Sequence, residues 1–82
     1  MQVEIVITLR ESILDPKGKA SHHALENLGF KDITGVRIGK FIQLDVDTND
    51  PDQARRAAEQ ACEKLLANMV MEDYEIRLPD NV

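Results

Sequence analysis

Apolar and polar residues alternate at the start of the chain. Val3, Ile5 and Ile7 fall on one face together with Leu9, and the residues between them fall on the other. A period of two predicts a β-strand over residues 2–9. Its second face also carries an apolar residue, Val6, so we expect this strand to be central in its sheet or covered on both sides.

Two later stretches carry the periodicity of helices, and each begins with Asp-Pro. Asp15 can cap the free N–H groups of a first helix, and Pro16 suits its first position. We predict this helix over residues 16–28, with Gly29 as the left-handed residue that ends it. The second helix is predicted over 51–67, because small and apolar residues recur at i, i+3, i+4 and i+7. These residues are Ala54, Ala57, Ala58, Ala61, Cys62, Leu65 and Leu66.

The remaining segments alternate like strands. Residues 36–38 predict a short strand, Gly39 a turn or bulge, and residues 42–46 a longer strand, although one long bent strand is the alternative. A final strand is predicted from about residue 71 to 78. The order β-α-β-β-α-β predicts a single α+β domain over residues 1–82. Its fold would be ferredoxin-like, with a short or bent second strand and an antiparallel sheet that carries both helices on one face.

Composition narrows the class of protein. A chain of 82 residues with only three aromatic side chains has a small aliphatic core. Small cores are often completed by association, so we predict at least a dimer. The formal net charge of −5 disfavours nonspecific binding to nucleic acids or anionic membranes. One cysteine and no apolar leader or long apolar run predict a cytoplasmic protein.

None of the candidate chemical groups predicts a catalytic or metal site. Adjacent His22 and His23 point about 100° apart on a helix and share no ligand partner. Cys62 lies on the apolar stripe, as expected for a buried structural thiol without a base. Four aspartates suggest a metal cluster but fit a strand's outer face and a helix cap better. They are Asp45, Asp47, Asp50 and Asp52.

One segment combines glycines with cations in this acidic chain. Residues 35–40 lack the spacing of a phosphate loop, so a phosphate cradle is disfavoured. Arg37 and Lys40 beside Gly39 are either solvated turn cations or part of a contact surface for a partner. The alternative contact surface is the entry to the first helix. Its residues are Leu14, Asp15, Pro16 and Gly18.

Five segments resemble the PurS family, the small subunit of formylglycinamide ribonucleotide amidotransferase. They are VEIVITL at 3–9, LDPKGKA at 14–20, ALENLGF at 24–30, VRIGK at 36–40 and CEKLLANMVMEDYEI at 62–76. The chain departs from the family pattern at residues 10–12, which lack its Lys-x-Gly turn, at Met69, where the family has proline, and at the histidine pair. These departures concern loop geometry.

The resemblance implies a function in purine synthesis. The enzyme converts formylglycinamide ribonucleotide to formylglycinamidine ribonucleotide with glutamine and ATP. A large synthetase subunit uses ATP and Mg, a glutaminase subunit carries the Cys nucleophile, and the small subunit is a homo-oligomer, dimer or tetramer, that bridges them without binding a cofactor. Two alternatives share the expected fold: an ACT-like regulatory domain that binds an amino acid, and an acylphosphatase. The second needs a glycine-dense phosphate loop, which residues 10–12 lack.

Overall fold

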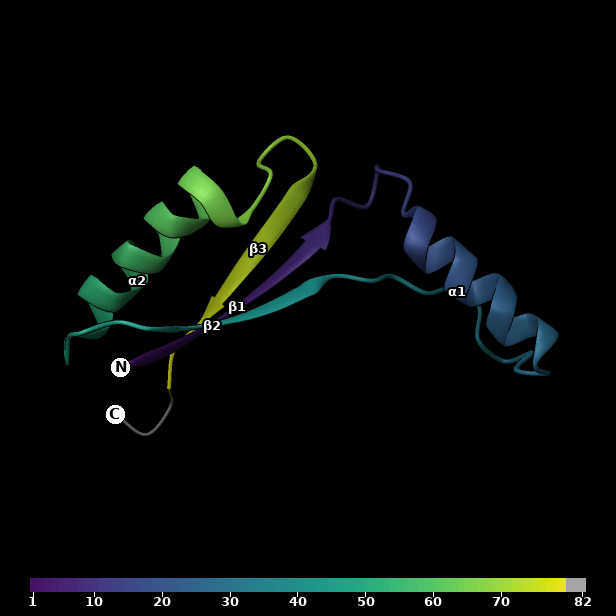
Figure 1. Cartoon of the computed structure of the whole chain (residues 1–82), viewed down its shortest axis with the longest axis horizontal. Helices are drawn as coiled ribbons and strands as arrows, with labels where there is room; N and C mark the ends of the chain where they lie inside the picture. The colour runs from purple at the N-terminus through teal and green to yellow at the C-terminus, as the bar shows by residue number, and fades with distance from the viewer. Residues whose placement is uncertain (80–82) are drawn as a thin grey trace.

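The computed structural model describes residues 1–79 and contains one three-stranded antiparallel sheet and two α-helices (Figure 1). The strand order in the sheet is β2-β1-β3, with β1 in the centre as predicted. The elements along the chain are β1 (Gln2–Leu9), α1 (Pro16–Asn27), β2 (Lys40–Asp45), α2 (Pro51–Ala61), the π-helical turn η1 (Cys62–Leu66) and β3 (Glu72–Arg77).

Both helices begin as the sequence predicts. The carboxylate of Asp15 accepts from the N–H of Gly18, and that of Asp50 accepts from the N–H of Asp52. Helix α1 ends at Asn27, one residue before the predicted end, and Gly29 just beyond it adopts a left-handed φ of 99°. Helix α2 and η1 together reach Leu66, within one residue of the predicted end. These ends are local features, so they follow from the sequence.

The core lies between α2 and the sheet. Val3, Ile5 and Ile7 of β1 are fully buried against the small side chains Ala54 and Ala58. Alternation along β1 therefore places its apolar face inward, as predicted. Helix α2 packs mainly over β1 and β3. Ile42 and Leu44 of β2 pack against the same core but are only half-buried, so α2 covers the β2 side of this face less completely.

Helix α1 extends away from the sheet (Figure 1). We call residues 10–39 the arm and the sheet with α2 and η1 the body. The Cα radius of gyration is 16.0 Å, against about 12 Å for a compact domain of this length. The prediction of both helices on one face of the sheet is therefore wrong for the single chain. The physical reason is that the links on either side of α1 continue outward and do not fold the helix back.

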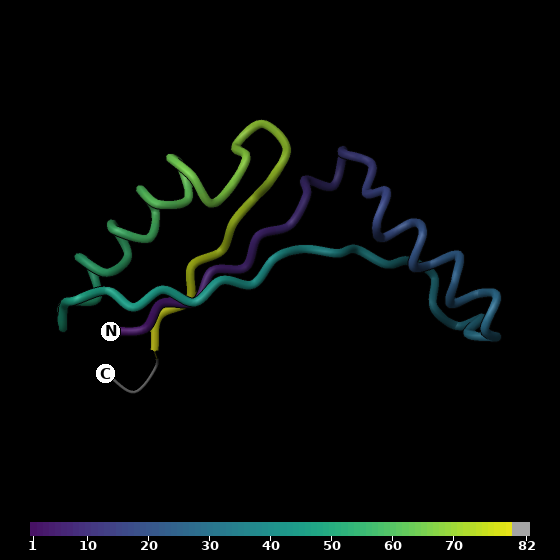
Figure 2. The backbone as a smooth tube through the Cα atoms, viewed as in Figure 1, coloured from purple at the N-terminus to yellow at the C-terminus, as the bar shows by residue number. Residues whose placement is uncertain are grey.

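The predicted second strand is also absent as a paired strand. Residues 33–39 run extended alongside α1 and continue straight into β2, as the backbone trace shows (Figure 2). A tight hairpin turn at Gly39 needs residues with positive φ. Among residues 1–79 only Gly29 has one, so no hairpin forms. The order is β-α-β-α-β, and one long bent segment is the better description of residues 33–45.

Candidate partner interface

The two segments predicted to contact partners meet where the arm joins the body. The Asp15 carboxylate connects them: Oδ1 accepts from the N–H of Gly18 at 2.9 Å, and Oδ2 accepts from the N–H of Ile38 at 2.8 Å. These two bonds hold the pKa of Asp15 below its usual value, the Gly18 bond most strongly. Asp15 therefore ties the start of α1 to the extended segment that returns to the body.

Two glycines allow the backbone segments to approach at this joint. A methyl group on Gly18 would lie closer than 3.0 Å to the carbonyl oxygen of Val36. A methyl group on Gly39 would meet the carbonyl oxygen of Ile7 equally closely. Both positions disfavour a side chain because the nearest neighbouring atom is a backbone oxygen. The two predicted glycines therefore serve the joint between arm and body.

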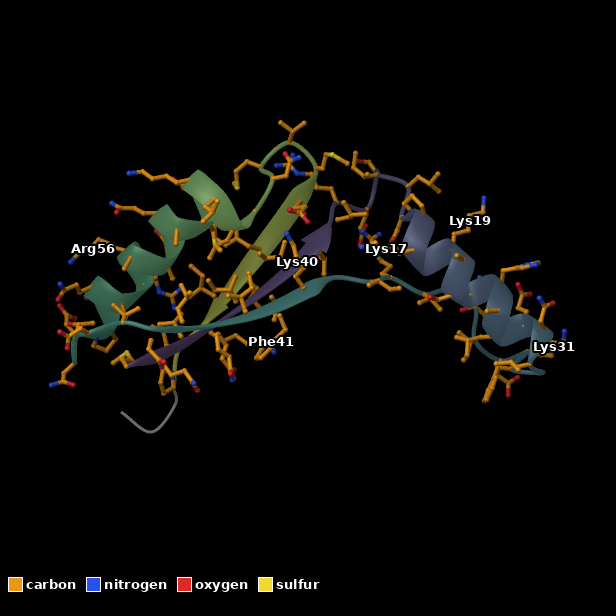
Figure 3. All side chains as sticks on the ribbon, in the orientation of Figure 1. Lys17, Lys19, Lys31, Lys40, Phe41 and Arg56 are labelled. Atoms are coloured by element: carbon orange, nitrogen blue, oxygen red, sulfur yellow. The ribbon has the colours of Figure 1, made fainter. Side chains whose placement is uncertain are left out.

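The two predicted cations have contacts within the chain. The Arg37 guanidinium donates to the carbonyl oxygen of Leu9. Lys40 Nζ donates to the carbonyl oxygen of Leu66 at 3.2 Å and lies 3.5 Å from the Glu72 carboxylate. Figure 3 shows Lys40 on the α2 side of the sheet. Lys40 thus ties β2 to the end of η1, and a role of either cation in partner contact stays a prediction.

A cavity of about 410 Å³ lies at the joint. Four of the predicted interface residues line it: Asp15, Pro16, Gly39 and Lys40. Leu14 and Arg37 line a neighbouring cavity of about 490 Å³ that also contains His22. One nitrogen of His22, Nε2, is already 2.9 Å from the carbonyl oxygen of Ile33. The structure brings the predicted interface residues together from two distant parts of the sequence.

Several exposed apolar side chains were not identified from the sequence. Phe30 and Phe41, two of the three aromatic residues, are 52% and 57% exposed, and Leu28 is 74% exposed. The exposure of Phe41 could have been predicted from the alternation in β2, which places this residue on the polar face with Gln43 and Asp45. The side chains of Met69 and Met71 are exposed as well. Large exposed apolar residues mark interaction surfaces when they gather.

The chain carries no exposed nucleophilic cysteine. Cys62 is fully buried, and burial raises the pKa of its thiol, with Glu63 and Glu59 adding to the effect. Residues 1–79 contain no group of three or more potential metal ligands. No helix in this part of the chain is long and apolar enough to span a membrane.

Charge is distributed unevenly between the arm and the rest of the chain. Residues 10–39 contain five Lys or Arg and four Asp or Glu, whereas the other residues contain five and eleven. Figure 3 shows Lys17, Lys19 and Lys31 on the arm. The arm is thus weakly cationic and the remainder strongly anionic. Opposite charges of this kind favour contact between an arm and a body in separate molecules.

The comparisons with known proteins agree across the whole chain. A family model described as "PurS: Phosphoribosylformylglycinamidine (FGAM) synthase" matches residues 2–80. The PurS subunit of this synthase from Bacillus subtilis is 41% identical over 81 residues, covering 99% of this chain and 95% of that protein. The crystal structure of Methanocaldococcus jannaschii PurS has a TM-score of 0.85 at 33% identity, with 93% of this chain and 92% of that one covered.

A further solved structure is described as PurLQS from Thermotoga maritima. It has a TM-score of 0.81 at 30% identity and covers 94% of this chain and 96% of that one. The sequence and structure comparisons identify the same family. The chain belongs to the PurS family and is a subunit of phosphoribosylformylglycinamidine synthase, a ligase of purine biosynthesis.

Proposed function

We propose that this chain is a non-catalytic adaptor that bridges the glutaminase and the ATP-dependent synthetase subunits. The observation that carries the proposal is its shape: an arm with an uncovered helix is attached to a body with a separate exposed face. The structure described as PurLQS from Thermotoga maritima, with which most of this chain aligns, supports an assembly of this kind.

The division of chemistry supports the adaptor role. Release of ammonia from glutamine by covalent catalysis needs a cysteine activated by a base. Cys62 is buried with a raised pKa, which suits packing and not nucleophilic attack. Glutamine cleavage is therefore assigned to the glutaminase subunit. ATP and Mg are assigned to the synthetase subunit, and we place the assembly in the cytoplasm.

Self-association is the second part of the proposal. Ala24 and Leu28 of the arm are exposed, and α2 leaves Ile42 and Leu44 of β2 only half-buried on the inner sheet face. The arm of a second copy supplies a helix with an exposed apolar stripe that can cover these residues. The opposite charges of arm and body favour that contact. A dimer, or a tetramer built from it, would then complete the ferredoxin-like arrangement with residues 33–38 paired as the missing strand.

Reconstitution tests the adaptor role. The purified chain should hydrolyse neither glutamine nor ATP. Added to the matching synthetase and glutaminase, it should restore turnover with glutamine, while turnover with ammonia should need it much less because free ammonia bypasses delivery. Equal glutamine-dependent turnover with and without the chain would contradict the proposal.

Sedimentation tests the arm contact with a matched pair of variants. Leu28→Glu places a charge on the exposed apolar stripe of α1, whereas Asn27→Glu adds the same charge at the preceding exposed residue. We expect Leu28→Glu to shift the chain to monomer at micromolar concentration and Asn27→Glu to leave the oligomer intact. A stable wild-type monomer at this concentration would overturn this part of the proposal.

A further inference from the structure

The sheet has a second face, on the side opposite α2, which we call the open face. Alternation along each strand assigns Glu4 and Val6 of β1, Phe41 and Asp45 of β2, and Asp73 and Glu75 of β3 to it. Figure 3 shows Phe41 projecting on the side away from α2. The arm contact proposed above uses the α2 side, so the open face stays free in that dimer.

An apolar pair lies at the centre of this face. Phe41 stands directly opposite Val6 in the pairing of β1 with β2, and its side chain is 57% exposed. Aromatic side chains surrounded by polar residues are typical anchors of protein interfaces. Burying the exposed part of the ring is favourable because apolar surface leaves water.

The rim of the open face is acidic. Four carboxylates belong to it, from Glu4, Asp45, Asp73 and Glu75. Two arginines offset them in part: Arg77 lies 3.0 Å from the Glu75 carboxylate, and Arg10 lies 3.4 Å from that of Asp73. The net charge of these six side chains is therefore negative. A second copy placed face to face would bring like charges together, which disfavours a homotypic contact.

We propose that the open face is the docking surface for another subunit of the synthase, at a site with Lys or Arg around an apolar pocket that receives Phe41. This inference rests on the proposed adaptor function and adds to it the surface and the chemistry of the partner. An adaptor of this form uses opposite sides of its sheet for different contacts: the α2 side for its own copy and the open side for a cationic partner.

Binding of three variants to the purified synthetase and glutaminase subunits tests the proposal. Phe41→Thr removes the ring and keeps a β-branched residue suited to a strand. Asp45→Lys reverses a charge on the rim, and Glu63→Lys makes a reversal of the same size on the exposed surface of η1. Thermal midpoint and oligomeric state are measured for each variant, so that a folding defect is recognised.

We expect Phe41→Thr to weaken binding to one of the two subunits by about tenfold or more, as truncation of an interface anchor does. Asp45→Lys should slow association and flatten its salt dependence, and Glu63→Lys should change neither. If the wild-type chain restores glutamine-dependent turnover while Phe41→Thr and Asp45→Lys bind as it does, the inference is overturned and the adaptor function stands. Loss of self-association in Phe41→Thr would overturn it too, because the face would then join copies. Failure of the wild-type chain to bind either subunit would contradict both the adaptor function and the docking surface.

Discussion

Gly39 is where the arm enters β2, and an alanine there tests how tightly this junction is packed. The added methyl would lie closer than 3.0 Å to the carbonyl oxygen of Ile7 and 3.0 Å from Cγ2 of Thr8. Both neighbours belong to the central strand β1, where Ile7 is fully buried. A packed interior gives β1 no space to retreat, so the start of β2 has to move.

The cost follows from the size of that movement. Separating the strands by roughly half an ångström or more stretches the nearest ladder hydrogen bonds beyond their usual range of about 2.7–3.2 Å. Loss of one or two such bonds costs about 0.5–1.5 kcal/mol each. The reduced entropy of the unfolded chain offsets about 0.4–1 kcal/mol of this. We expect Gly39→Ala to lower the free energy of unfolding by about 1 kcal/mol.

Urea unfolding at one fixed protein concentration, followed by circular dichroism, measures this difference. Gly35→Ala is the matched control, because a methyl group at Gly35 meets no atom within 4 Å. Gly35 also lacks a positive φ, which among residues 1–79 only Gly29 adopts. We expect the control to be as stable as the wild type or more stable by up to about 1 kcal/mol, because only the entropy term remains. Equal midpoints for the two alanine variants would refute the packing argument.

Three further predictions concern the joint, the thiol and the charges. Asp15→Asn should speed amide hydrogen exchange at Gly18 and Ile38 with little change in the body. The pKa of Asp15 is lowered in the folded chain from its ordinary value of 3.8. The ionised carboxylate therefore stabilises the fold fully above pH 3.8, and this stabilisation is lost as the pH falls through the lower folded pKa. Exchange protection at the joint should therefore be unaffected by ionisation of Asp15 between pH 5 and pH 8. Cys62→Ala should cost about 1 kcal/mol of stability and leave glutamine-dependent turnover of the reconstituted enzyme unchanged; a large loss of turnover at equal folding would implicate the thiol in chemistry. Raising the salt concentration should weaken self-association, because arm and body carry opposite charges; sedimentation that is independent of salt would count against this contact.

The features predicted correctly from the sequence are those set by neighbouring residues. Asp15 with Pro16 and the apolar stripe from Ala54 onward determine the helix ends and faces locally. The alternation of Val3, Ile5 and Ile7 determines the buried face of β1. Each of these signals lies within one element, and each is found in the structure.

The position of α1 was not predictable from such local signals. The position of α1 depends on whether the chain turns at Gly39 or continues into β2 without a turn. A single glycine between Ile38 and Lys40 is compatible with both backbone conformations. The bond from Ile38 to Asp15 joins residues far apart in the sequence and has no periodicity. The role proposed for Phe41 was not predicted from the sequence for a related reason: a strand pattern predicts which face a side chain occupies but not whether a second molecule covers that face.

The small core leads to a last prediction, that stability depends on protein concentration. The fully buried side chains are aliphatic, alanine or cysteine, and Ala20, Ala24 and Leu28 on the arm stay exposed within residues 1–79. If a second copy supplies this cover, folding and association are linked. A tenfold rise in concentration then adds about 1.4 kcal/mol per dimer. The shift in thermal midpoint is this free energy divided by the unfolding entropy of both chains together. The midpoint should therefore rise by about 3–6 °C for each tenfold rise in concentration. Leu28→Glu should remove this dependence, and a wild-type midpoint that stays constant from about 1 to 100 µM would show that the chain folds without its partner.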